Sequence, residues 1–313
     1  MNSAGINGDH GMTTATTNTQ AKPHFLMCRP EHFGVIYSIN PWMNPSGWAR
    51  EKTSLAASSH RQWARLHRTL LDLGADVDLV PPVAGLPDLV FTANAAVVLD
   101  RTVLLARFRH AERQAEEAHF EAAFRRLQAH GVLDSVTRMP DGITLEGAGD
   151  CVFDQIRGVF WMGYGPRTDQ RARPIVADLF ATEVVALELA DPRFYHMDTA
   201  LCPLSGGELL YIPGAFTDAG RAAIAARVIP EQRIAVDEKD AVRLAANTVC
   251  VGDVLVMPAC SPRLRAILAE RGYRVEVNPL PAFLRSGGAA FCLTLRLDRR
   301  SNAVSTEQDA AVA

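Results

Sequence analysis

The sequence has no surplus of charge of one sign and no long hydrophobic run. Its 32 lysines and arginines are nearly balanced by 35 aspartates and glutamates, which leaves a formal net charge of −3 over 313 residues. Nucleic acids and anionic membrane surfaces attract a surplus of basic residues, so this balance argues against both as partners. Because no uninterrupted apolar stretch reaches about 18 residues, we also expect no membrane-spanning helix.

A secretion signal and a paired-cysteine motif are also missing. Residues 1–24 have no basic start and no apolar core, and their Thr, Asn and Gly content predicts a disordered lead-in. Residues 299–313 are expected to form a loose C-terminal tail. The cysteines include no C-x-x-C pair, which favours a reducing cytoplasm over a disulfide framework and predicts a buried, apolar role for most of them. They are Cys28, Cys151, Cys202, Cys250, Cys260 and Cys292.

Motifs that hold common cofactors and metals are missing as well. No G-x-G-x-x-G follows an expected strand, which disfavours a doubly wound nucleotide-binding sheet, and nothing else implies a cofactor. The sequence contains His, Asp, Glu and Cys but no H-E-x-x-H, no C-x-x-C and no calcium-binding loop. We therefore expect neither a cofactor nor a metal site.

The apolar residues that are present indicate helices. A composition of 48% hydrophobic and 21% charged residues excludes collagen-like, coiled-coil and wholly disordered chains and is ample for a buried core. Apolar residues at helical spacing, followed by glycine, predict helices over 48–73 and 110–130. A Ser-Pro start predicts a third over 261–271. Shorter helices are expected over 169–181, 218–226 and 237–245.

Strand pairs of a common form lie between these helices. Each has a polar or Gly-containing turn, an apolar strand, a short turn and a second apolar strand, and the last is expected to pair with the first strand of the chain, HFLMCR. Such units cannot bury their faces alone, so five of them are expected to close into a ring, with chance similarity among hairpins as the competing explanation. Their equivalent positions recur about every 50 residues, at Asn94, Asp150, Asp198, Asn247 and Gly288.

The turns at one end of every unit would face the axis of such a ring. Their side chains would then converge and supply a nucleophile, a base and carboxylates, as in a cysteine-dependent hydrolase or transferase. The convergent set is Asn94, Glu146, Asp150, His196, Asp198, Asn247 and Cys292.

Cys292 is the candidate nucleophile. It follows the run SGGAA, whose small residues allow a ligand or another backbone to approach closely. Strand alternation would place Cys292 on one face with Thr294 and Arg296, opposite three leucines. A polar face of this kind predicts a reactive cysteine rather than a core one.

His196 and Glu146 are the candidate base and cation partner. His196 is the histidine expected at the mouth of a strand, and Asp198, two residues on, would orient its imidazole; a structural histidine is the alternative. Glu146 and Asp150 in LEGAGD are two carboxylates separated by small residues, which suits a flat cation such as a guanidinium. A simple turn is the competing explanation for that motif.

These motifs resemble a known group of enzymes. The strings FLMCRPEHFGVIYSINPWMNP, LPDLVFTANAAVVL, LEGAGD, FYHMDTALCPL, YIPGAF and SGGAAFCLTLR resemble the arginine deiminase and amidinotransferase superfamily. The resemblance is greatest to the arginine dihydrolase branch, with dimethylarginine dimethylaminohydrolase as a near relative. It implies an α/β fold, a five-bladed pseudosymmetric α/β propeller of ββαβ units (the pentein-like ring), as a single catalytic domain over 25–298.

The resemblance also implies roles for individual residues. Cys292 would be the nucleophile, His196 the general acid and base, and Glu146 the carboxylate that holds the guanidinium. Asp198 would be a second partner of the guanidinium or the imidazole. From its place in LEGAGD, Asp150 is expected to complete the anionic end of the substrate site with Glu146 and Asp198. The other positions matched to substrate binding are two arginines that would clamp the substrate's α-carboxylate and two asparagines typical of the dihydrolase branch: Arg113, Arg167, Asn40 and Asn94.

The implied reaction is cleavage of guanidino C–N bonds in free L-arginine through a covalent thiouronium on Cys292. Deiminases and dimethylarginine hydrolases usually carry an acid where Asn94 stands, so ornithine with loss of both ammonias competes with citrulline as the product. The alternatives are hydrolysis of dimethylarginine to citrulline and dimethylamine, amidinotransfer to an amine, and a silent ring that only binds. The expected partner is arginine or a methylated arginine, and a homo-oligomer is compatible with the sequence.

Overall fold

A computed structural model describes residues 22–301 of the chain. The predicted lead-in and tail therefore lie almost wholly outside the described residues. The first strand begins at His24, one residue before the predicted start of the domain. At the other end, the carbonyl of Arg299 accepts a hydrogen bond from the backbone N–H of Asp100 at 2.9 Å, so the chain still contacts the fold beyond residue 298.

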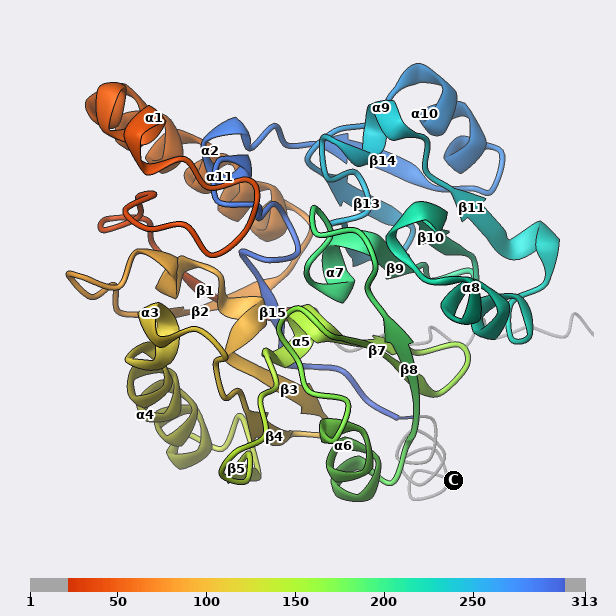
Figure 1. Cartoon of the computed structure of the whole chain (residues 1–313), viewed down its shortest axis with the longest axis horizontal. Coiled ribbons are helices and arrows are strands. Elements are labelled where there is room, and N and C mark those ends of the chain that lie inside the picture. Colours follow the sequence, from red (N-terminus) through yellow and green to blue (C-terminus); the bar gives the residue numbers. More distant parts are fainter. Residues whose placement is uncertain (1–21, 302–313) are drawn as a thin grey trace, which may run out of the picture.

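The strands of the described part form five small sheets of three strands each, so the chain has a mixed α/β fold (Figure 1). The strands are β1 (His24–Cys28), β2 (Asp76–Val80), β3 (Ala96–Leu99), β4 (Thr102–Leu105), β5 (Ser135–Arg138), β6 (Cys151–Asp154), β7 (Val159–Tyr164), β8 (Glu183–Glu188), β9 (Leu201–Pro203), β10 (Leu209–Tyr211), β11 (Arg233–Ala235), β12 (Val249–Val251), β13 (Val254–Met257), β14 (Arg274–Val277) and β15 (Leu295–Arg296).

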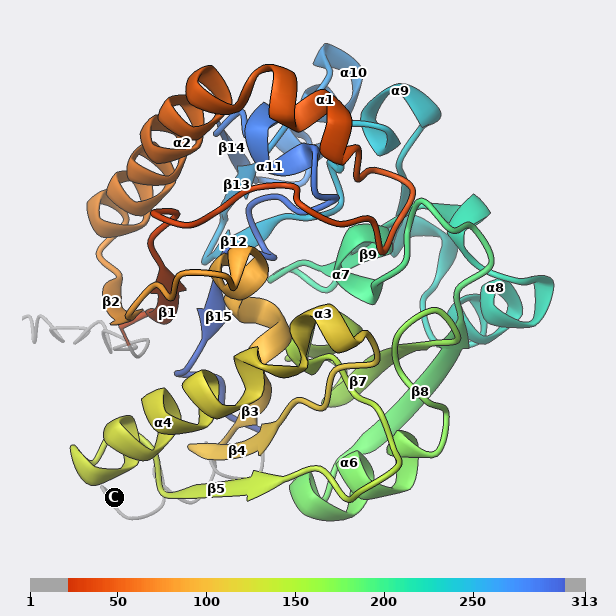
Figure 2. The ribbon, with the colours of Figure 1, turned by 60° about the vertical axis from the view of Figure 1, so that its left-hand side comes forward.

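The same pairing pattern recurs in every sheet of residues 22–301. A first strand pairs antiparallel with a second, and the second pairs parallel with a third, as in β3, β4 and β5. A parallel neighbour needs a crossover, and a helical segment supplies it each time. In the remaining sheet the first strand is β15, which pairs antiparallel with β1 (Figure 2). The predicted pairing between the two ends of the chain is thus confirmed.

The longer helices lie at the outside of the molecule in Figure 1, whereas the short α5 and α7 lie between sheets. The helices are α1 (Pro45–Arg50), α2 (Lys52–Asp72), α3 (Ala111–Gln114), α4 (Glu116–Ala129), α5 (Gly147–Asp150), α6 (Ala172–Phe180), α7 (Met197–Ala200), α8 (Asp218–Ala225), α9 (Glu238–Ala241), α10 (Pro262–Ala269) and α11 (Pro281–Leu284), with 3₁₀ turns η1 (Pro87–Val90), η2 (Thr92–Ala95), η3 (Pro213–Ala215) and η4 (Pro230–Gln232).

Capping residues and apolar spacing in the sequence predicted most of these helices. The hydroxyl of Ser261 accepts a hydrogen bond from the N–H of Leu264 at 3.2 Å, so the predicted Ser-Pro cap of α10 is confirmed. The two long predicted helices are each divided by one residue: Glu51 separates α1 from α2, and Ala115 separates α3 from α4.

The core is built from inward faces of sheets and helices. Helix α2 buries Trp63, Leu66 and Leu70, and each such side chain contributes about 1.5–3 kcal/mol by leaving water. Among the helices of residues 22–301, none has the length and hydropathy that crossing a membrane requires.

Candidate active site

The residues of the predicted convergent set lie where each unit enters its first strand. Asn94 is in η2 just before β3, Glu146 precedes α5 and β6, and Asn247 stands two residues before β12. His196 and Asp198 lie at the start of α7, before β9, and Cys292 lies shortly before β15. Because these entry points occur at the same place in every unit, the fold brings them together from distant parts of the sequence.

The thiol of Cys292 is buried, with only 2% of the residue exposed. Its Sγ donates a hydrogen bond to Oδ2 of Asp198 at 3.1 Å and accepts one from Nδ2 of Asn247 at 3.1 Å. Asn247 also accepts a hydrogen bond from the N–H of Cys292 at 3.2 Å, so one amide holds both ends of the residue. We call Cys292, Asp198 and Asn247 the thiol side of the site.

The predicted strand around Cys292 is wrong. The chain turns there, with the N–H of Leu293 bonded to the carbonyl of Ala289 at 3.2 Å and that of Thr294 to Phe291 at 2.9 Å. Strand alternation therefore does not apply, and Thr294 is buried instead of sharing an open polar face. The small residues before Cys292 are explained by close packing of the backbone, as the sequence predicted. A Cβ on Gly288 would lie 2.4 Å from the ring of Phe91.

Asp198 has one oxygen without a partner. Its Oδ2 binds the thiol, whereas Oδ1 is buried and accepts no hydrogen bond from any described residue. Burial raises the pKa of Asp198 to about 7, and burial together with Asp198 raises the pKa of Cys292 well above its usual range. The thiol is therefore protonated at neutral pH in this state, and the free oxygen beside it is a position for a donor.

The imidazole side of the site, as we call His196, Glu146 and Arg167, is a buried hydrogen-bonded chain. Nε2 of His196 lies 2.7 Å from Oε2 of Glu146, and Nη1 of Arg167 donates to the same oxygen at 2.9 Å. The carboxylate that pairs with the imidazole is thus Glu146, and the prediction that Asp198 fills this position is wrong. His196 precedes a helical turn, so Asp198, two residues on, points instead to the thiol.

On the imidazole side, the carboxylate of Glu146 is charged and the imidazole of His196 is neutral at neutral pH. Burial alone would raise the pKa of Glu146, but Arg167 and the His196 hydrogen bond hold it below its usual range. Burial lowers the pKa of His196 to about 4, although Glu146 opposes this. At neutral pH the imidazole is therefore neutral, and facing a carboxylate it carries its proton on Nε2.

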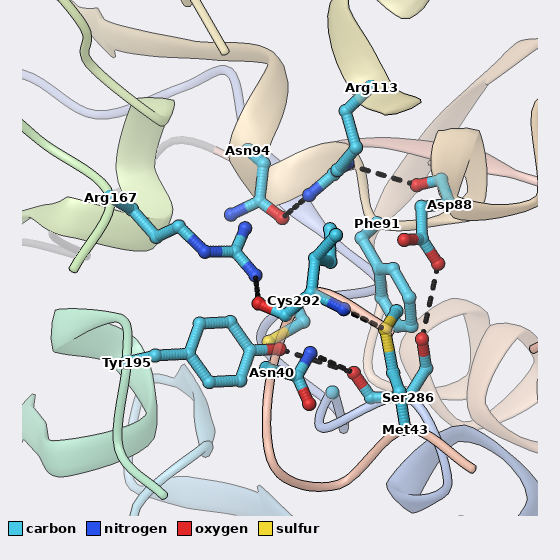
Figure 3. Close-up of a pocket in the computed structure, with 12 residues that line it drawn as sticks. Asn40, Met43, Asp88, Phe91, Asn94, Arg113, Arg167, Tyr195, Ser286 and Cys292 are labelled. Carbon is cyan, nitrogen blue, oxygen red and sulfur yellow. Dashed lines mark hydrogen bonds between the residues drawn. The ribbon is translucent and has the colours of Figure 1, made fainter. Parts of the chain in front are cut away.

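A small cavity opens beside the thiol (Figure 3). Figure 3 shows Arg113, from α3, and Arg167, from the loop after β7, on either side of Asn94. Besides these arginines, Asp88 is a charged residue of the lining, and sequence analysis missed it although it lies in the quoted LPDLVFTAN string. The lining residues are Ile39, Asn40, Met43, Asp88, Phe91, Asn94, Arg113, Arg167, Tyr195, Ser286, Gly288 and Cys292.

The two predicted asparagines line this cavity and are both hydrogen-bonded. Nδ2 of Asn40 donates to the carbonyl of Ser286 at 3.0 Å, which ties the loop before α1 to the segment that leads to the thiol. Oδ1 of Asn94 accepts a hydrogen bond from Nη1 of Arg113 at 2.9 Å. Asp88 accepts hydrogen bonds from the hydroxyls of Tyr37 at 2.8 Å and Ser286 at 3.1 Å.

Arg113 is held by Glu116, a second residue that sequence analysis missed. The guanidinium donates to both carboxylate oxygens, at 3.0 and 2.8 Å, and both side chains are buried. Burial raises the pKa of Glu116 to about 7 against the opposing effect of Arg113. The spacing of three residues could have revealed the pair, but amphipathic helices usually place such pairs in solvent.

Asp150 lies outside the cavity lining. It accepts hydrogen bonds from the hydroxyl of Thr168 at 2.7 Å and the N–H of Met197 at 3.1 Å, and so links α5 to α7. The small residues of LEGAGD permit this packing: Gly147 has φ +62°, and a Cβ on Gly149 would lie 2.1 Å from Nδ2 of Asn94.

Across residues 22–301, no three His, Cys, Asp or Glu side chains lie close enough to hold a metal ion.

Comparisons with known proteins agree with this arrangement. The model of the eukaryotic N,N dimethylarginine dimethylhydrolase family matches residues 29–299. The bifunctional arginine dihydrolase/ornithine cyclodeaminase ArgZ of Synechocystis is 47% identical over 272 residues, which are 87% of this chain and 37% of that protein. The chain thus spans little more than a third of that relative. The N(G),N(G)-dimethylarginine dimethylaminohydrolase of Mycobacterium tuberculosis is 36% identical, over 87% of this chain and 85% of the relative.

A solved structure shows the same fold. The N-terminal domain of ArgZ, an arginine dihydrolase, in a Cys-to-Ser mutant bound to substrate, has a TM-score of 0.82 and 43% identity, covering 89% of this chain and 99% of that one. The resemblance found in the sequence motifs, including that to the dihydrolase branch, is confirmed by these matches. The chain therefore belongs to the N,N dimethylarginine dimethylhydrolase family.

Proposed function

We propose that this protein is a hydrolase that cleaves the guanidino C–N bonds of free L-arginine through a covalent bond to Cys292. The observation that carries the proposal is the unpartnered Oδ1 of Asp198, buried beside the thiol. A guanidinium N–H that donates to this oxygen would bring the cationic carbon next to Sγ, and pairing a buried carboxylate with a guanidinium is strongly favourable. The relatives named arginine dihydrolases support arginine as the substrate.

We also propose that the five sheets are the blades of a closed pseudosymmetric α/β propeller. Two observations support closure: the identical pairing pattern of each sheet in the described residues, and the pairing of β15 with β1. A ring explains why residues at the entry to each first strand share one site.

The far end of the substrate would be held by the charged residues of the lining. Arg113 and Arg167 are buried cations that suit the α-carboxylate, and Asp88 suits the α-ammonium. Asn40 and Asn94 would place hydrogen-bonding groups between the two ends. Asp150 would act on the substrate only through α5 and α7, because it lies outside the cavity lining and joins these two helices.

The first half of the reaction follows from the charges. The guanidinium cation lowers the pKa of the neighbouring thiol, whose proton already points to Asp198. The thiolate attacks the guanidinium carbon, and the C–N bond to one amino group breaks. His196, neutral before the attack, takes up the proton lost by the thiol and delivers it to that nitrogen, which leaves as ammonia. A cationic thiouronium remains on Cys292.

In the second half, water replaces the sulfur. His196 takes a proton from water, the oxygen attacks the thiouronium carbon, and the C–S bond breaks to give a ureido product, a free thiol and one proton. Glu146 orients the imidazole on Nε2 and keeps Arg167 in place. With Asn94 rather than an acid in the lining, the neutral ureido group is retained for a second cycle, which yields ornithine, carbon dioxide and a second ammonia.

The test is a product analysis on free arginine. We expect two ammonia molecules for each ornithine formed, without added cofactor. Citrulline as the sole stable product would refute the second cycle but leave the first intact. Turnover of dimethylarginine in preference to arginine would instead establish the methylated substrate, and turnover only with glycine or a similar acceptor would establish amidinotransfer.

A cytoplasmic location is part of the same proposal. All six cysteines are free thiols in the structure, which suits a reducing compartment.

A further inference from the structure

Two thiols outside the catalytic machinery lie against each other. Cys202 lies in β9 and Cys250 in β12, strands of two different sheets, and their Sγ atoms are 3.7 Å apart. Cys202 is buried, whereas Cys250 is partly exposed. A disulfide has an S–S length of about 2.0 Å, so forming one would require the sulfurs to approach by only about 1.7 Å.

Each of these cysteines lies a few residues after one that holds the catalytic thiol. Asp198 lies in α7, which runs into β9 and Cys202, and Asn247 is separated from Cys250 by two residues. The two segments are already joined, because Nδ2 of Asn247 donates to the carbonyl of Asp198 at 3.1 Å. The Sγ of Cys202 also contacts the carbonyl of Thr248 at 3.4 Å, next to Asn247.

Positive charge near the pair favours reaction at Cys250. Nη1 of Arg296 donates to the carbonyl of Cys250 at 3.0 Å. The hydrogen bond with Cys202 lowers the pKa of Cys250 against the effect of burial, and Arg299 and Arg296 lower it further. By contrast, burial raises the pKa of Cys260, the other partly exposed cysteine, to about 11. Of these thiols, Cys250 is thus the better nucleophile toward an oxidant.

We propose that Cys202 and Cys250 are a redox modification site whose disulfide slows turnover at Cys292 by displacing Asp198 and Asn247. With a peroxide as oxidant, the Cys250 thiolate attacks one oxygen, the O–O bond breaks and a sulfenic acid forms. The sulfur of Cys202 then attacks that of Cys250, the S–O bond breaks, and the oxygen leaves as water with the proton of Cys202. The two cysteines lose two electrons in total, and the peroxide gains them.

The first experiment measures the bond and needs no substrate. The full chain and its Cys292→Ser variant are treated with a limited amount of hydrogen peroxide, alkylated, and digested without reductant. We expect a cross-linked peptide containing Cys202 and Cys250, and an intact mass lower by two hydrogens that dithiothreitol restores. Recovery of Cys202 and Cys250 as separate peptides, alkylated or over-oxidised, would overturn the proposal.

The second experiment measures the effect on turnover and rests on the proposed function. Treated wild type should lose about tenfold or more in arginine turnover and regain it with dithiothreitol, because small displacements of catalytic groups have effects of that size. Cys250→Ala should resist the treatment, and Cys260→Ala, a matched control at another partly exposed cysteine, should behave as wild type. Equal losses in wild type and Cys250→Ala would overturn the link to the active site. If arginine is not a substrate at all, the peptide map still tests the disulfide.

Discussion

The thiol side and the imidazole side of the site each contain one buried carboxylate, and the pKa values of the two carboxylates are shifted in opposite directions. On the imidazole side, the carboxylate of Glu146 faces Arg167 and His196, and these partners keep its pKa low. On the thiol side, the carboxylate of Asp198 meets the thiol and forms no ion pair within the described residues, and burial raises its pKa to about 7.

This difference indicates that the imidazole side is complete before substrate binds, whereas the thiol side is completed by the substrate. The imidazole side has an internal cation and is complete within the chain. The thiol side lacks a cation among its described partners, so its thiol stays protonated and one oxygen of Asp198 stays unpaired. A cationic substrate would supply the missing charge, and reactivity of the thiol would then depend on its arrival.

The largest expected effect comes from removing the nucleophile. Cys292→Ser should reduce turnover on the order of 10³-fold or more, because a serine hydroxyl ionises far less readily than a thiol and is the weaker nucleophile. The hydrogen bonds to Asp198 and Asn247 are compatible with a hydroxyl, so circular dichroism and thermal unfolding should match wild type. Unchanged turnover would refute Cys292 as the nucleophile.

Neutralising the carboxylate of each side separates their contributions. Glu146→Gln should lower kcat on the order of 10²-fold or more and also destabilise the fold by about 3–5 kcal/mol, because Arg167 is left buried without its counter-charge. Asp198→Asn should leave stability near wild type or above it and should mainly raise KM, because the guanidinium loses its partner. Steady-state kinetics and urea unfolding on both variants test this. Equal losses of stability in the two would contradict the comparison.

The two sides should also respond to pH with opposite sign. His196 has a folded pKa of about 4, below its ordinary 6.5, so between those values the unfolded chain binds more protons and the free energy of unfolding falls as pH falls. Asp198 has a folded pKa of about 7, above its ordinary 3.8, so there the free energy of unfolding falls as pH rises.

Variants of these two residues isolate each effect. The free energy of unfolding of His196→Asn, relative to that of wild type, should rise by about 3 kcal/mol as pH falls from about 6.5 to 4. That of Asp198→Asn should rise by about 4 kcal/mol relative to wild type as pH rises from about 4 to 7. Urea unfolding at several pH values measures both. Differences from wild type that do not change with pH would show that neither group is shifted.

The smallest effect is expected where packing supports both sides. A Cβ at Gly149 would collide with Nδ2 of Asn94, so Gly149→Ala should displace Asn94 and with it Arg113, reducing kcat/KM about tenfold. Gly214 has no neighbour within 4 Å of such a Cβ, and Gly214→Ala is the matched control. Equal activity of both variants would mean that Asn94 tolerates displacement.

Short-range signals made the helices and strand pairs predictable from the sequence. The cap at Ser261 and the apolar spacing of 48–73 depend on neighbours along the chain, so local chemistry sufficed to place α10 and α2. The choice of Cys292, His196 and Asp198 as a group also came from the sequence, because the repeat puts them at equivalent entry points.

The partners of those residues were not predictable in the same way. Strand alternation assigned Asp198 to His196, but Asp198 lies in the helical turn α7, which follows His196. The imidazole pairs instead with Glu146, 50 positions away in the chain. Glu116 and Asp88 escaped notice because nothing local distinguishes a buried acid from a solvated one. Their burial depends on which loops fold over them.

The sequence by itself determined the near-neutral surface balance, the repeating units, the cysteine and histidine at their entry points, and the family. Those properties follow from residue types and spacing, which act through local backbone preferences. The tertiary structure alone decided which carboxylate meets the imidazole, which meets the thiol, and which oxygen of Asp198 is left unpaired. These are outcomes of non-local packing, where burial and neighbouring charges set each group's protonation.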